Sequence, residues 1–386
     1  MCITKSTFLK NNEVFLHKTI EDKTIVWSSS TNQYVIVENQ TAEIIKRLSR
    51  ADAPKEIAKE LAAQLTLPVQ NCRALITQIQ DRFFDPLEQQ QHTQLKELKN
   101  TPLPQDFLVI KYYRINAIVI KAAFKSQLEC QLVHPKFEHL QVPPTKYDSC
   151  FEVFIKDEAI FLFVNSQFVN AWESQDVHYF QGKFSMELIQ QIHKKQEQQW
   201  MGVFHASAVS DTQNALLFLG DSGNGKSTSL ALLQTHGFTC IADDFVPVAL
   251  QNQEIYSFPA AISIKKSSLK TLLPYYPELN KATEYDFKTT QKIVRYLKPN
   301  NRDYTTHLPC KGLVFIKYLE NAPTTCPKIS KIDAFERLVP DSWISPKKEN
   351  AHAFLNWFDL LACYQLTYSN TKQMVTEVSK LFKDEL

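Results

Sequence analysis

The sequence predicts an α/β protein whose core is built around a phosphate-binding loop, preceded by a small winged-helix-like α+β domain and a strand-rich middle region. Three observations support this class. Residues 220–227 (Gly-Asp-Ser-Gly-Asn-Gly-Lys-Ser) fit the pattern G-x-x-x-x-G-K-[ST] without a mismatch. An apolar run comes directly before this stretch, and a helix-like run follows it. The N-terminal part shows strand-like runs followed by three helical patterns.

The composition is that of an ordinary globular chain with two or three domains. Of its 386 residues, 44% are hydrophobic and 22% are charged, and the net charge is +2. Because this balance gives no overall signal for a polyanion, we expect no nucleic-acid partner. No apolar run approaches the ~18 residues of a membrane span, so we expect no membrane partner. The eight scattered cysteines form no C-x-x-C pair, which is typical of reduced thiols in a cytoplasmic protein.

The first domain is expected at residues 1–88. Apolar residues over 26–37 suit short strands, and residues 39–41 are typical of a helix start. Two further helices should begin near Pro54 and Pro68, since proline suits the first turn of a helix. A small sheet with three helices is a winged-helix-like arrangement.

A polar linker is expected at 89–105 and the strand-rich middle region at 106–199. Strand-like runs fall at 107–112, 117–124, 150–155 and 160–164, and a helix is expected at 186–198. We interpret the aromatic residues of this region as core rather than as a cofactor cage; they include Tyr112, Tyr113, Phe124, Phe151 and Phe154.

The last domain, 200–386, contains the phosphate-binding loop. The order is a buried strand at 214–219, the loop, a helix at 227–235, and a second strand at 238–242 that ends in an Asp-Asp pair. Gly237 suits the C′ position after the helix. More strand-like pieces follow Leu250, and a closing helix is expected at 370–382.

The residue types of the loop suit phosphate and magnesium. The chain has only 7 glycines, and three of them lie in the loop, where they let backbone N–H groups turn toward phosphate oxygens. Lys226, expected in an exposed position, would reach the terminal phosphates, and the Ser227 hydroxyl would ligate Mg²⁺. The following helix adds its positive end. The residues expected to bind ATP are Gly220, Asp221, Ser222, Gly223, Asn224, Gly225, Lys226, Ser227 and Thr228.

The core resembles the HPr kinase/phosphorylase family and its kinase-like relatives over roughly residues 200–248. The resemblance rests on His205, on the loop, on Gly237 and on the pair Asp243-Asp244, at spacings similar to those of the family. It implies a P-loop kinase fold of the HPr kinase / PEP carboxykinase type that uses ATP and Mg²⁺.

Two further segments refine the resemblance. The chain lacks the glycine-rich signature that follows the aspartates in true HPr kinases, which argues against phosphorylase activity and against HPr as the substrate. Residues 259–265 instead resemble the HPr-kinase-related proteins of peptide-modification clusters. The N-terminal domain resembles PqqD-like proteins, which recognise the leaders of precursor peptides, on the basis of residues 37–42 and the three helices.

The resemblance implies a catalytic base in the aspartate pair. Neighbouring residues at a strand end point to opposite sides, so one carboxylate can face the attacking hydroxyl while the other addresses Mg²⁺. We expect Asp244 to be the base and Asp243 to lie on the metal side, although the residues leave the reverse open. His205 is an acid–base or phosphate-contact candidate through the resemblance. Lys265 and Arg295 are candidates to neutralise the transferring charge, the alternative being simple solvation.

These features favour an ATP-dependent kinase that phosphorylates a Ser/Thr hydroxyl of a peptide or small protein, held through its leader by the N-terminal domain. A kinase of free serine or another small hydroxyl metabolite is an alternative. A second alternative is a nucleotide-switched binding protein without transfer activity. Residues 1–90 contain 11 Lys+Arg and 11 Asp+Glu, so the net charge there is zero and DNA binding is disfavoured. GTP or pyrophosphate as donor, and the oligomeric state, stay open.

Overall fold

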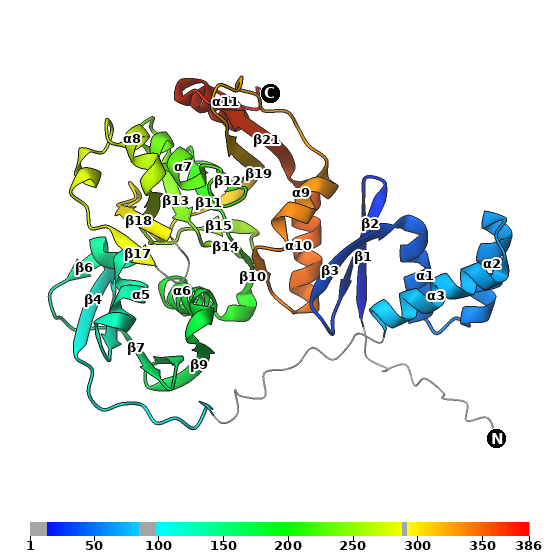
Figure 1. The fold of residues 1–386 in the computed structure, drawn as a ribbon, viewed down its shortest axis with the longest axis horizontal. Helices are drawn as coiled ribbons and strands as arrows, with labels where there is room; N and C mark the ends of the chain where they lie inside the picture. Colours follow the sequence, from blue (N-terminus) through cyan, green and yellow to red (C-terminus); the bar gives the residue numbers. More distant parts are fainter. Residues whose placement is uncertain (1–13, 85–97, 288–291, 386) are drawn as a thin grey trace. The chain divides into compact units, whose positions relative to one another are not determined.

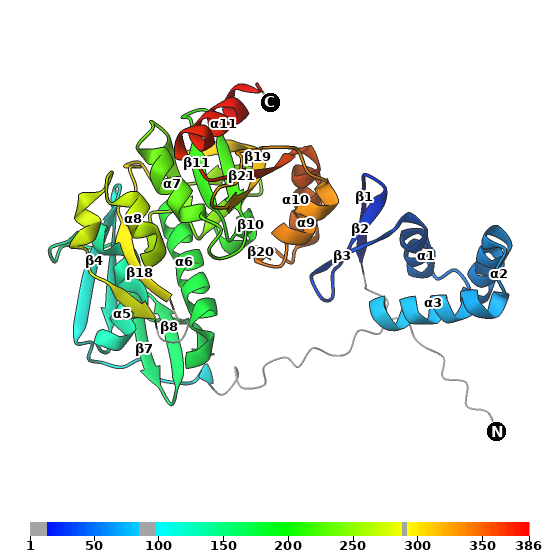
Figure 2. The same ribbon diagram turned by 45° about the horizontal axis from the view of Figure 1, so that its top comes forward.

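The computed structural model describes residues 14–84, 98–287 and 292–385 as a mixed α/β protein (Figures 1 and 2). The described residues form two compact units. The smaller unit combines the N-terminal part with residues 345–359, and the larger unit contains the rest. Most of the linker expected at 89–105 lies outside the described residues.

The smaller unit is built on a three-stranded antiparallel sheet in the order β1-β2-β3. Its strands are β1 (Phe15–Ile20), β2 (Lys23–Ser28) and β3 (Gln33–Glu38), and its first helices are α1 (Asn39–Ser49), α2 (Pro54–Leu65) and α3 (Val69–Phe83). Val26 and Val35 are directly paired on neighbouring strands and pack into the core formed by the three helices. The three helices therefore lie against one face of the sheet, because side chains alternate between faces.

The opposite face of this sheet is also apolar. Ile25 and Trp27, one position to either side of Val26, are fully buried. A helix that the sequence analysis did not predict, α10 (Lys348–Leu360), belongs to this unit. The ring of Phe354 on α10 packs edge-on against Tyr34 of β3, with 5.4 Å between the ring centroids.

An ion pair adds to the packing of α10. The Lys18 ammonium lies 2.8 Å from the Asp359 carboxylate and donates a hydrogen bond to the Asn356 side chain at 3.1 Å. The small unit thus consists of three layers, with α1–α3 on one face of the sheet and α10 on the other. Its last layer comes from a segment that the sequence analysis had assigned to the third domain.

The larger unit contains a nine-stranded mixed sheet that carries the loop. Its order is β13-β11-β12-β19-β15-β14-β10-β20, with β21 beside β19. The strands are β10 (Trp200–Phe204), β11 (Ser207–Ser210), β12 (Ala215–Leu219), β13 (Thr239–Asp243), β14 (Val246–Ala249), β15 (Glu254–Tyr256), β19 (His307–Tyr318), β20 (Ser342–Ile344) and β21 (Ala362–Tyr368). Strands β12, β19 and β21 are parallel neighbours.

Helices cover this sheet through a continuous apolar core. Helix α7 (Lys226–Gln234) packs on β11 and β13, and α11 (Thr371–Lys383) packs on β21. Their apolar residues share one cluster with Phe218 of β12 and Ile316 of β19. The strand, helix and strand expected around the loop are confirmed by β12, α7 and β13, and the closing helix by α11.

The middle region forms a second sheet, in the order β6-β4-β5-β7-β8-β9. Its elements are β4 (Val109–Ile115), β5 (Ile118–Phe124), α5 (Gln127–Phe137), β6 (Gln141–Val142), β7 (Ser149–Lys156), β8 (Ala159–Val164), β9 (Gln167–Glu173) and α6 (Val177–His193). The strand-rich prediction is confirmed, and Phe124, Phe151 and Phe154 are core residues. Helix α6 lies against β8 and β9 and begins earlier than the helix expected at 186–198, because Val177 and Phe180 already extend its buried stripe.

A third sheet in the large unit, ordered β16-β18-β17, borders the loop region. Its strands are β16 (Ile262–Lys265), β17 (Tyr285–Phe287) and β18 (Lys292–Leu297), and the described part of this unit also contains the α-helices α8 (Leu269–Leu272) and α9 (Lys331–Leu338).

In the described part of the chain, none of the helices has the length and apolar character needed to cross a membrane. Five of the seven cysteines within it are buried.

Candidate functional site

The loop connects the end of β12 with the start of α7. At Gly220, φ is +133°, and an added Cβ would lie 2.9 Å from the carbonyl oxygen of Ile316, so only glycine fits. Gly225, with φ of +96°, is the N-cap of α7. The apolar residues of α7 are buried in the core cluster, which fixes the N-terminus of the helix beside the loop.

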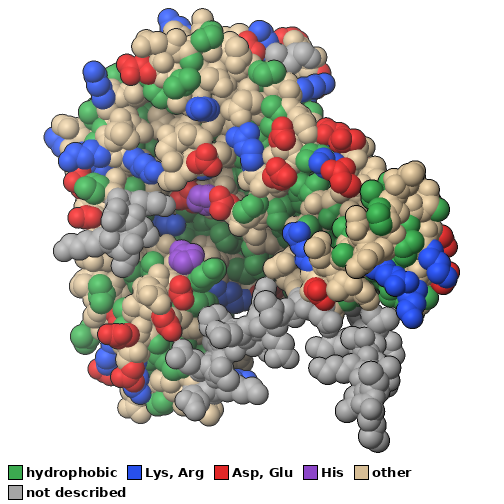
Figure 3. All heavy atoms as spheres, turned by 45° about the vertical axis from the view of Figure 1, so that its right-hand side comes forward, with side chains coloured by type: hydrophobic (Ala, Val, Ile, Leu, Met, Phe, Trp, Pro, Cys, Tyr) green, Lys and Arg blue, Asp and Glu red, His purple; other side chains and the backbone are tan. Residues whose placement is uncertain are grey.

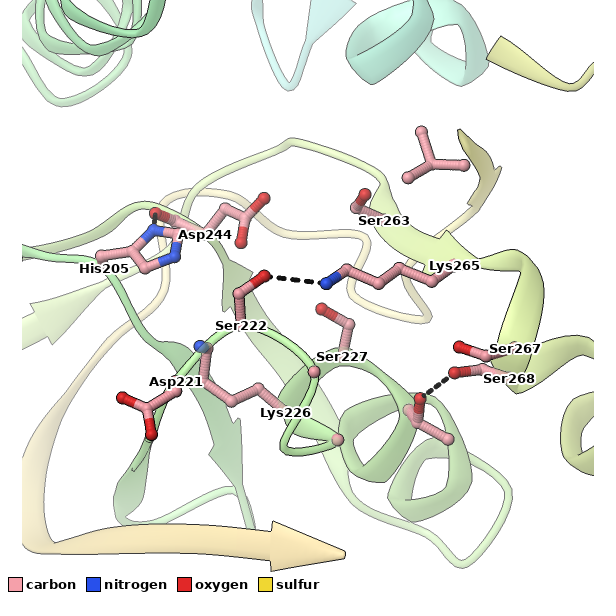
Figure 4. A pocket seen from close by; sticks show the side chains of 14 residues that line it. His205, Asp221, Ser222, Lys226, Ser227, Asp244, Ser263, Lys265, Ser267 and Ser268 are labelled. Carbon is pink, nitrogen blue, oxygen red and sulfur yellow. Dashed lines mark hydrogen bonds between the residues drawn. The ribbon is translucent and has the colours of Figure 1, made fainter. Parts of the chain in front are cut away.

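A pocket that is open to solvent surrounds the loop (Figure 4). Besides residues of the loop and of the first turn of α7, its lining includes His205 and Asp244 at one end and Ser267 and Ser268 at the other. Lys265 reaches across from β16 toward Ser222. The pocket therefore collects side chains from several elements that are far apart in the sequence.

Lys226 lies deeper than the sequence analysis expected. It is 8% exposed, and its ammonium donates a hydrogen bond to the Gly220 carbonyl. Burial lowers the pKa of Lys226, while the nearby carboxylates of Asp244 and Asp243 act in the opposite direction. The expected exposed position was wrong because the loop folds over the lysine stem, but the ammonium still lines the pocket.

Asp243 is buried at the end of β13 and is surrounded by hydrogen-bond donors. Its carboxylate accepts from the Ser207 hydroxyl at 2.5 Å, from the Ser227 hydroxyl at 3.0 Å and from the backbone N–H of Ser263 at 3.2 Å. Burial, with a smaller contribution from the neighbouring Asp244 charge, raises its pKa to about 7, although the donors oppose the shift. At neutral pH this carboxylate is therefore close to its titration point.

Asp244 follows β13 in a left-handed conformation with φ of +63°. This turn directs its side chain into the pocket, which Asp243 does not line. His205 lies beside it, and the His205 Nδ1 is 3.3 Å from the Asp244 carbonyl oxygen. The structure thus brings His205 and Asp244 together at one end of the pocket, whereas Asp243 is buried and does not line it.

Lys265 and Arg295, both candidates from the sequence, occupy different environments. The Lys265 ammonium donates to the Ser222 hydroxyl at 2.8 Å and lines the pocket. Lys265 pairs with Val294 on β18, which also lines the pocket. Arg295 is the next residue on β18 and points to the other face, since neighbours on a strand alternate.

Arg295 serves a structural contact instead. Its guanidinium donates to the carbonyl oxygens of Leu279 and Asn280, at 2.5 and 3.0 Å, and lies 3.3 Å from the Glu284 carboxylate. Arg295 does not line the pocket. The structure therefore does not place Arg295 where it could neutralise charge in this pocket.

The sequence analysis missed the serines that hold the site together. Ser207 is fully buried on β11, directly paired with Asp243 on β13. The hydroxyls of Thr228 and Ser268 are 2.7 Å apart and join α7 to the segment after β16. A serine inside the apolar run of β11 was the available signal, because a hydroxyl buried in a strand needs a partner.

The residues present fit Mg²⁺ and a nucleoside triphosphate. The Ser227 hydroxyl lines the pocket and lies 3.0 Å from the buried Asp243 carboxylate, so these two oxygens would be the protein ligands of Mg²⁺, which in phosphate sites typically takes one or two protein oxygens plus phosphate and water. Among the described residues, no group of three His, Cys, Asp or Glu side chains is placed as an all-protein metal cage. Glycine at 220 and the free N-terminus of α7 leave room for backbone N–H groups to face an anion.

Comparisons with known proteins add little. No family model matches the chain, and no curated protein matches it. Among solved structures, it is weakly similar to the HPr(Ser) kinase/phosphatase from Coxiella burnetii. The identity is 7%, the TM-score is 0.20, and the match covers 47% of this chain and 94% of that chain. A TM-score this low does not establish a common fold.

Proposed function

We propose that this protein is an ATP- and Mg²⁺-dependent kinase that phosphorylates a Ser or Thr hydroxyl of a peptide or small protein. One observation carries the proposal: a single pocket brings together a phosphate-binding loop, a basic side chain from another strand and a carboxylate that lies at a strand end. These are the parts that phosphoryl transfer needs, since the reaction depends on positioning and on charge stabilisation. The sequence resemblance to HPr-kinase-like proteins points to the same chemistry.

Each residue has a role that follows from its position. Lys226 and the N–H groups of the loop would hold the terminal phosphates, and Lys265 would stabilise the charge on the transferring group. Ser227 and Asp243 would hold Mg²⁺, which supplies charge neutralisation at the phosphates when bound. Asp244, which reaches into the pocket, would accept the proton of the attacking hydroxyl. His205 would position Asp244 or contact a phosphate.

The roles of the two aspartates can be separated by conservative variants. Asp244→Asn should keep Mg²⁺-dependent ATP binding and reduce transfer by about 100-fold or more, because it removes a base and keeps the shape. Asp243→Asn should raise the Mg²⁺ concentration needed for half-maximal activity. The acceptors offered are free L-serine and an equimolar library of Ser- and Thr-containing peptides, with [γ-³²P]ATP as donor. If Asp243→Asn alone abolishes transfer at saturating Mg²⁺, the two roles are reversed.

The same experiment distinguishes a peptide kinase from a kinase of free serine. Label in the peptides supports the proposal, whereas label in free serine alone would make the chain a small-metabolite kinase. ATP binding without transfer to any acceptor, water included, would favour the nucleotide-switched binding protein.

We propose further that the smaller unit holds the peptide substrate. A small hollow lies between β2, β3 and the end of α3, with Val26, Val35 and Phe83 as apolar lining and the exposed Arg82 at its side. Within the described residues, β3 ends the sheet order, so an added strand could pair with it. Figure 3 shows basic and acidic side chains interspersed over one face of the molecule, and residues 1–90 carry no net charge, which suits a peptide better than a nucleic acid.

Two charge-reversal variants on one helix test this role in the full chain. Arg82→Glu should lower the ratio of kcat/KM for a long peptide over that for its own short core, since leader binding raises the effective concentration of the acceptor. Arg73→Glu changes the same charge at another exposed position of α3 and should leave the ratio unchanged. Equal ratios for wild type and Arg82→Glu would exclude this hollow as a binding site for the peptide.

A further inference from the structure

The loop has a second neighbour that the proposed chemistry does not use, the side chain of Tyr318 at the end of β19. Its backbone N–H donates to the Asn224 carbonyl at 3.0 Å, which ties it to the loop. A Cβ added at Gly225 would lie 3.4 Å from the Tyr318 Cβ. Tyr318 is nevertheless 50% exposed, and the next residue, Leu319, is 48% exposed. An aromatic and an aliphatic side chain thus face solvent directly beside a phosphate-binding loop.

The ring of Tyr318 is supported from below by a buried network. It packs edge-on against Tyr368 on β21, with 5.6 Å between ring centroids and an interplanar angle of 74°. Tyr368 is 2% exposed, and its hydroxyl lies 2.7 Å from the Ser229 hydroxyl on α7. Ser229 in turn donates to the Gly225 carbonyl at 2.8 Å. The loop, the first turn of α7 and the two tyrosines are therefore held as one assembly.

The sheet order places this ring across the loop from the acid pair. Parallel strands β12, β19 and β21 end at the same edge, where ligands of such sheets bind. Asp243 and Asp244 lie at the end of β13. In the sheet order, β11 and β13 follow β12 on one side, whereas β19 is its neighbour on the other side. A nucleotide whose transferable phosphate lies by Asp244 and Lys265 must direct its base away from them. The end of the pocket opposite His205 and Asp244 is crossed by the Thr228–Ser268 hydrogen bond and is lined by Ser267 and Ser268.

We propose that Tyr318, with Leu319 beside it, is the surface on which the purine base of the bound nucleotide stacks. This inference rests on the proposed function, because it needs the loop to bind the phosphates. Stacking on an aromatic face tolerates any base, since every base has a π-face. The site should therefore accept adenine and guanine alike and should favour a nucleoside triphosphate over an inorganic polyphosphate.

Calorimetric titrations of the full-length protein test the proposal. The probes are the non-hydrolysable analogues AMP-PNP and GMP-PNP and inorganic tripolyphosphate, each with Mg²⁺. Tyr318→Ala should weaken both analogues about 10-fold and leave tripolyphosphate unchanged. Tyr318→Phe keeps the ring and should bind all three like the wild type. Tyr179→Ala, which removes a tyrosine that is 61% exposed on α6, is the matched control and should change nothing.

Four results would overturn the inference, one of them together with the proposed function. Unchanged affinity of Tyr318→Ala for AMP-PNP would place the base elsewhere. An equal loss for tripolyphosphate would show that Tyr318 only supports the loop. Failure of the wild type to bind any of the three probes would overturn the proposed function itself, whereas tripolyphosphate binding as tight as that of AMP-PNP would overturn only the base site.

Discussion

The hydrogen bond between Ser207 and Asp243 gives a prediction whose size can be worked from the structure. The Ser207 hydroxyl donates at 2.5 Å, and both side chains are at most 1% exposed. A hydrogen bond to a charged group contributes about 1.5–3 kcal/mol, so Ser207→Ala should disfavour the ionised carboxylate by that amount. The variant should therefore raise the pKa of Asp243 further above its value of about 7.

The sign of the effect follows from proton linkage. Because the pKa of Asp243 in the folded protein lies above the ordinary value of 3.8, the folded state holds a proton that the unfolded state has released. Stability contributed by this group is present at low pH and is lost as the pH rises from about 4 to about 7. In the proposed function Asp243 holds Mg²⁺, so the ion would compete with the same proton, and its affinity should rise with pH and level off above about 7.

In Ser207→Ala, this plateau should move to higher pH. Near neutral pH, Mg²⁺ affinity should fall by about 10- to 100-fold, and it should recover as the pH approaches 9. The assay is Mg²⁺-dependent binding of AMP-PNP between pH 6 and 9. Ser210→Ala is the matched control, since Ser210 is equally buried on β11 but its hydroxyl accepts a hydrogen bond from the Thr212 backbone. If Ser207→Ala shows the wild-type pH profile, Asp243 is not tuned by this contact.

Two further predictions concern a buried histidine and the basic side chain of the pocket. Burial lowers the pKa of His193 to about 4, so the free energy of unfolding should fall by at most about 3 kcal/mol as the pH drops from 6.5 to 4. His193→Phe should reduce the dependence of the melting temperature on pH over that range. His178→Phe, which changes a histidine at an exposed site, should not. An unaltered acid slope in His193→Phe would contradict this. Lys265→Met should slow phosphoryl transfer by about 100-fold. Lys266→Met alters the neighbouring lysine, which does not line the pocket, and should leave the rate unchanged. Equal rates in both variants would exclude Lys265 from charge stabilisation.

The parts of the site that could be predicted from sequence are those set by local pattern. The strand, loop and helix around Gly220 and Lys226 lie together in the chain, and the glycines have no other reason to gather there. The pairing of Lys265 with Val294, and the opposite direction of Arg295, depend on the register of two strands about 30 residues apart. No local pattern sets that register, so Lys265 and Arg295 could not be separated from sequence.

The helix α10 could not be predicted from sequence as part of the smaller unit, for a different reason. Strand β2 carries apolar residues on both faces, with Val26 on one and Ile25 and Trp27 on the other. Such a strand needs cover on two sides, which was a readable signal. The segment that packs on the second face lies more than 300 residues away in the chain. The entropic cost of loop closure rises only slowly with loop length, so distance along the chain does not restrict which segment can pack there.

This arrangement also decides how the smaller unit should be tested. Removing the N-terminal residues would leave the apolar residues of α10, Phe354 among them, without the sheet against which they pack. Point variants in the full chain therefore test substrate holding more cleanly than a truncated chain does.

The central claim is that the loop pocket binds Mg²⁺–nucleotide for phosphoryl transfer. The most direct measurement is calorimetric binding of AMP-PNP to the wild type and to Lys226→Ala, with and without Mg²⁺, alongside the melting temperature of each. Lys226 is buried, so the melting temperature shows whether the variant still folds. We expect Mg²⁺-dependent binding by the wild type and a loss of at least about 10-fold in a folded Lys226→Ala. Wild-type protein that binds no nucleotide, or a folded Lys226→Ala that binds as tightly as the wild type, would contradict it.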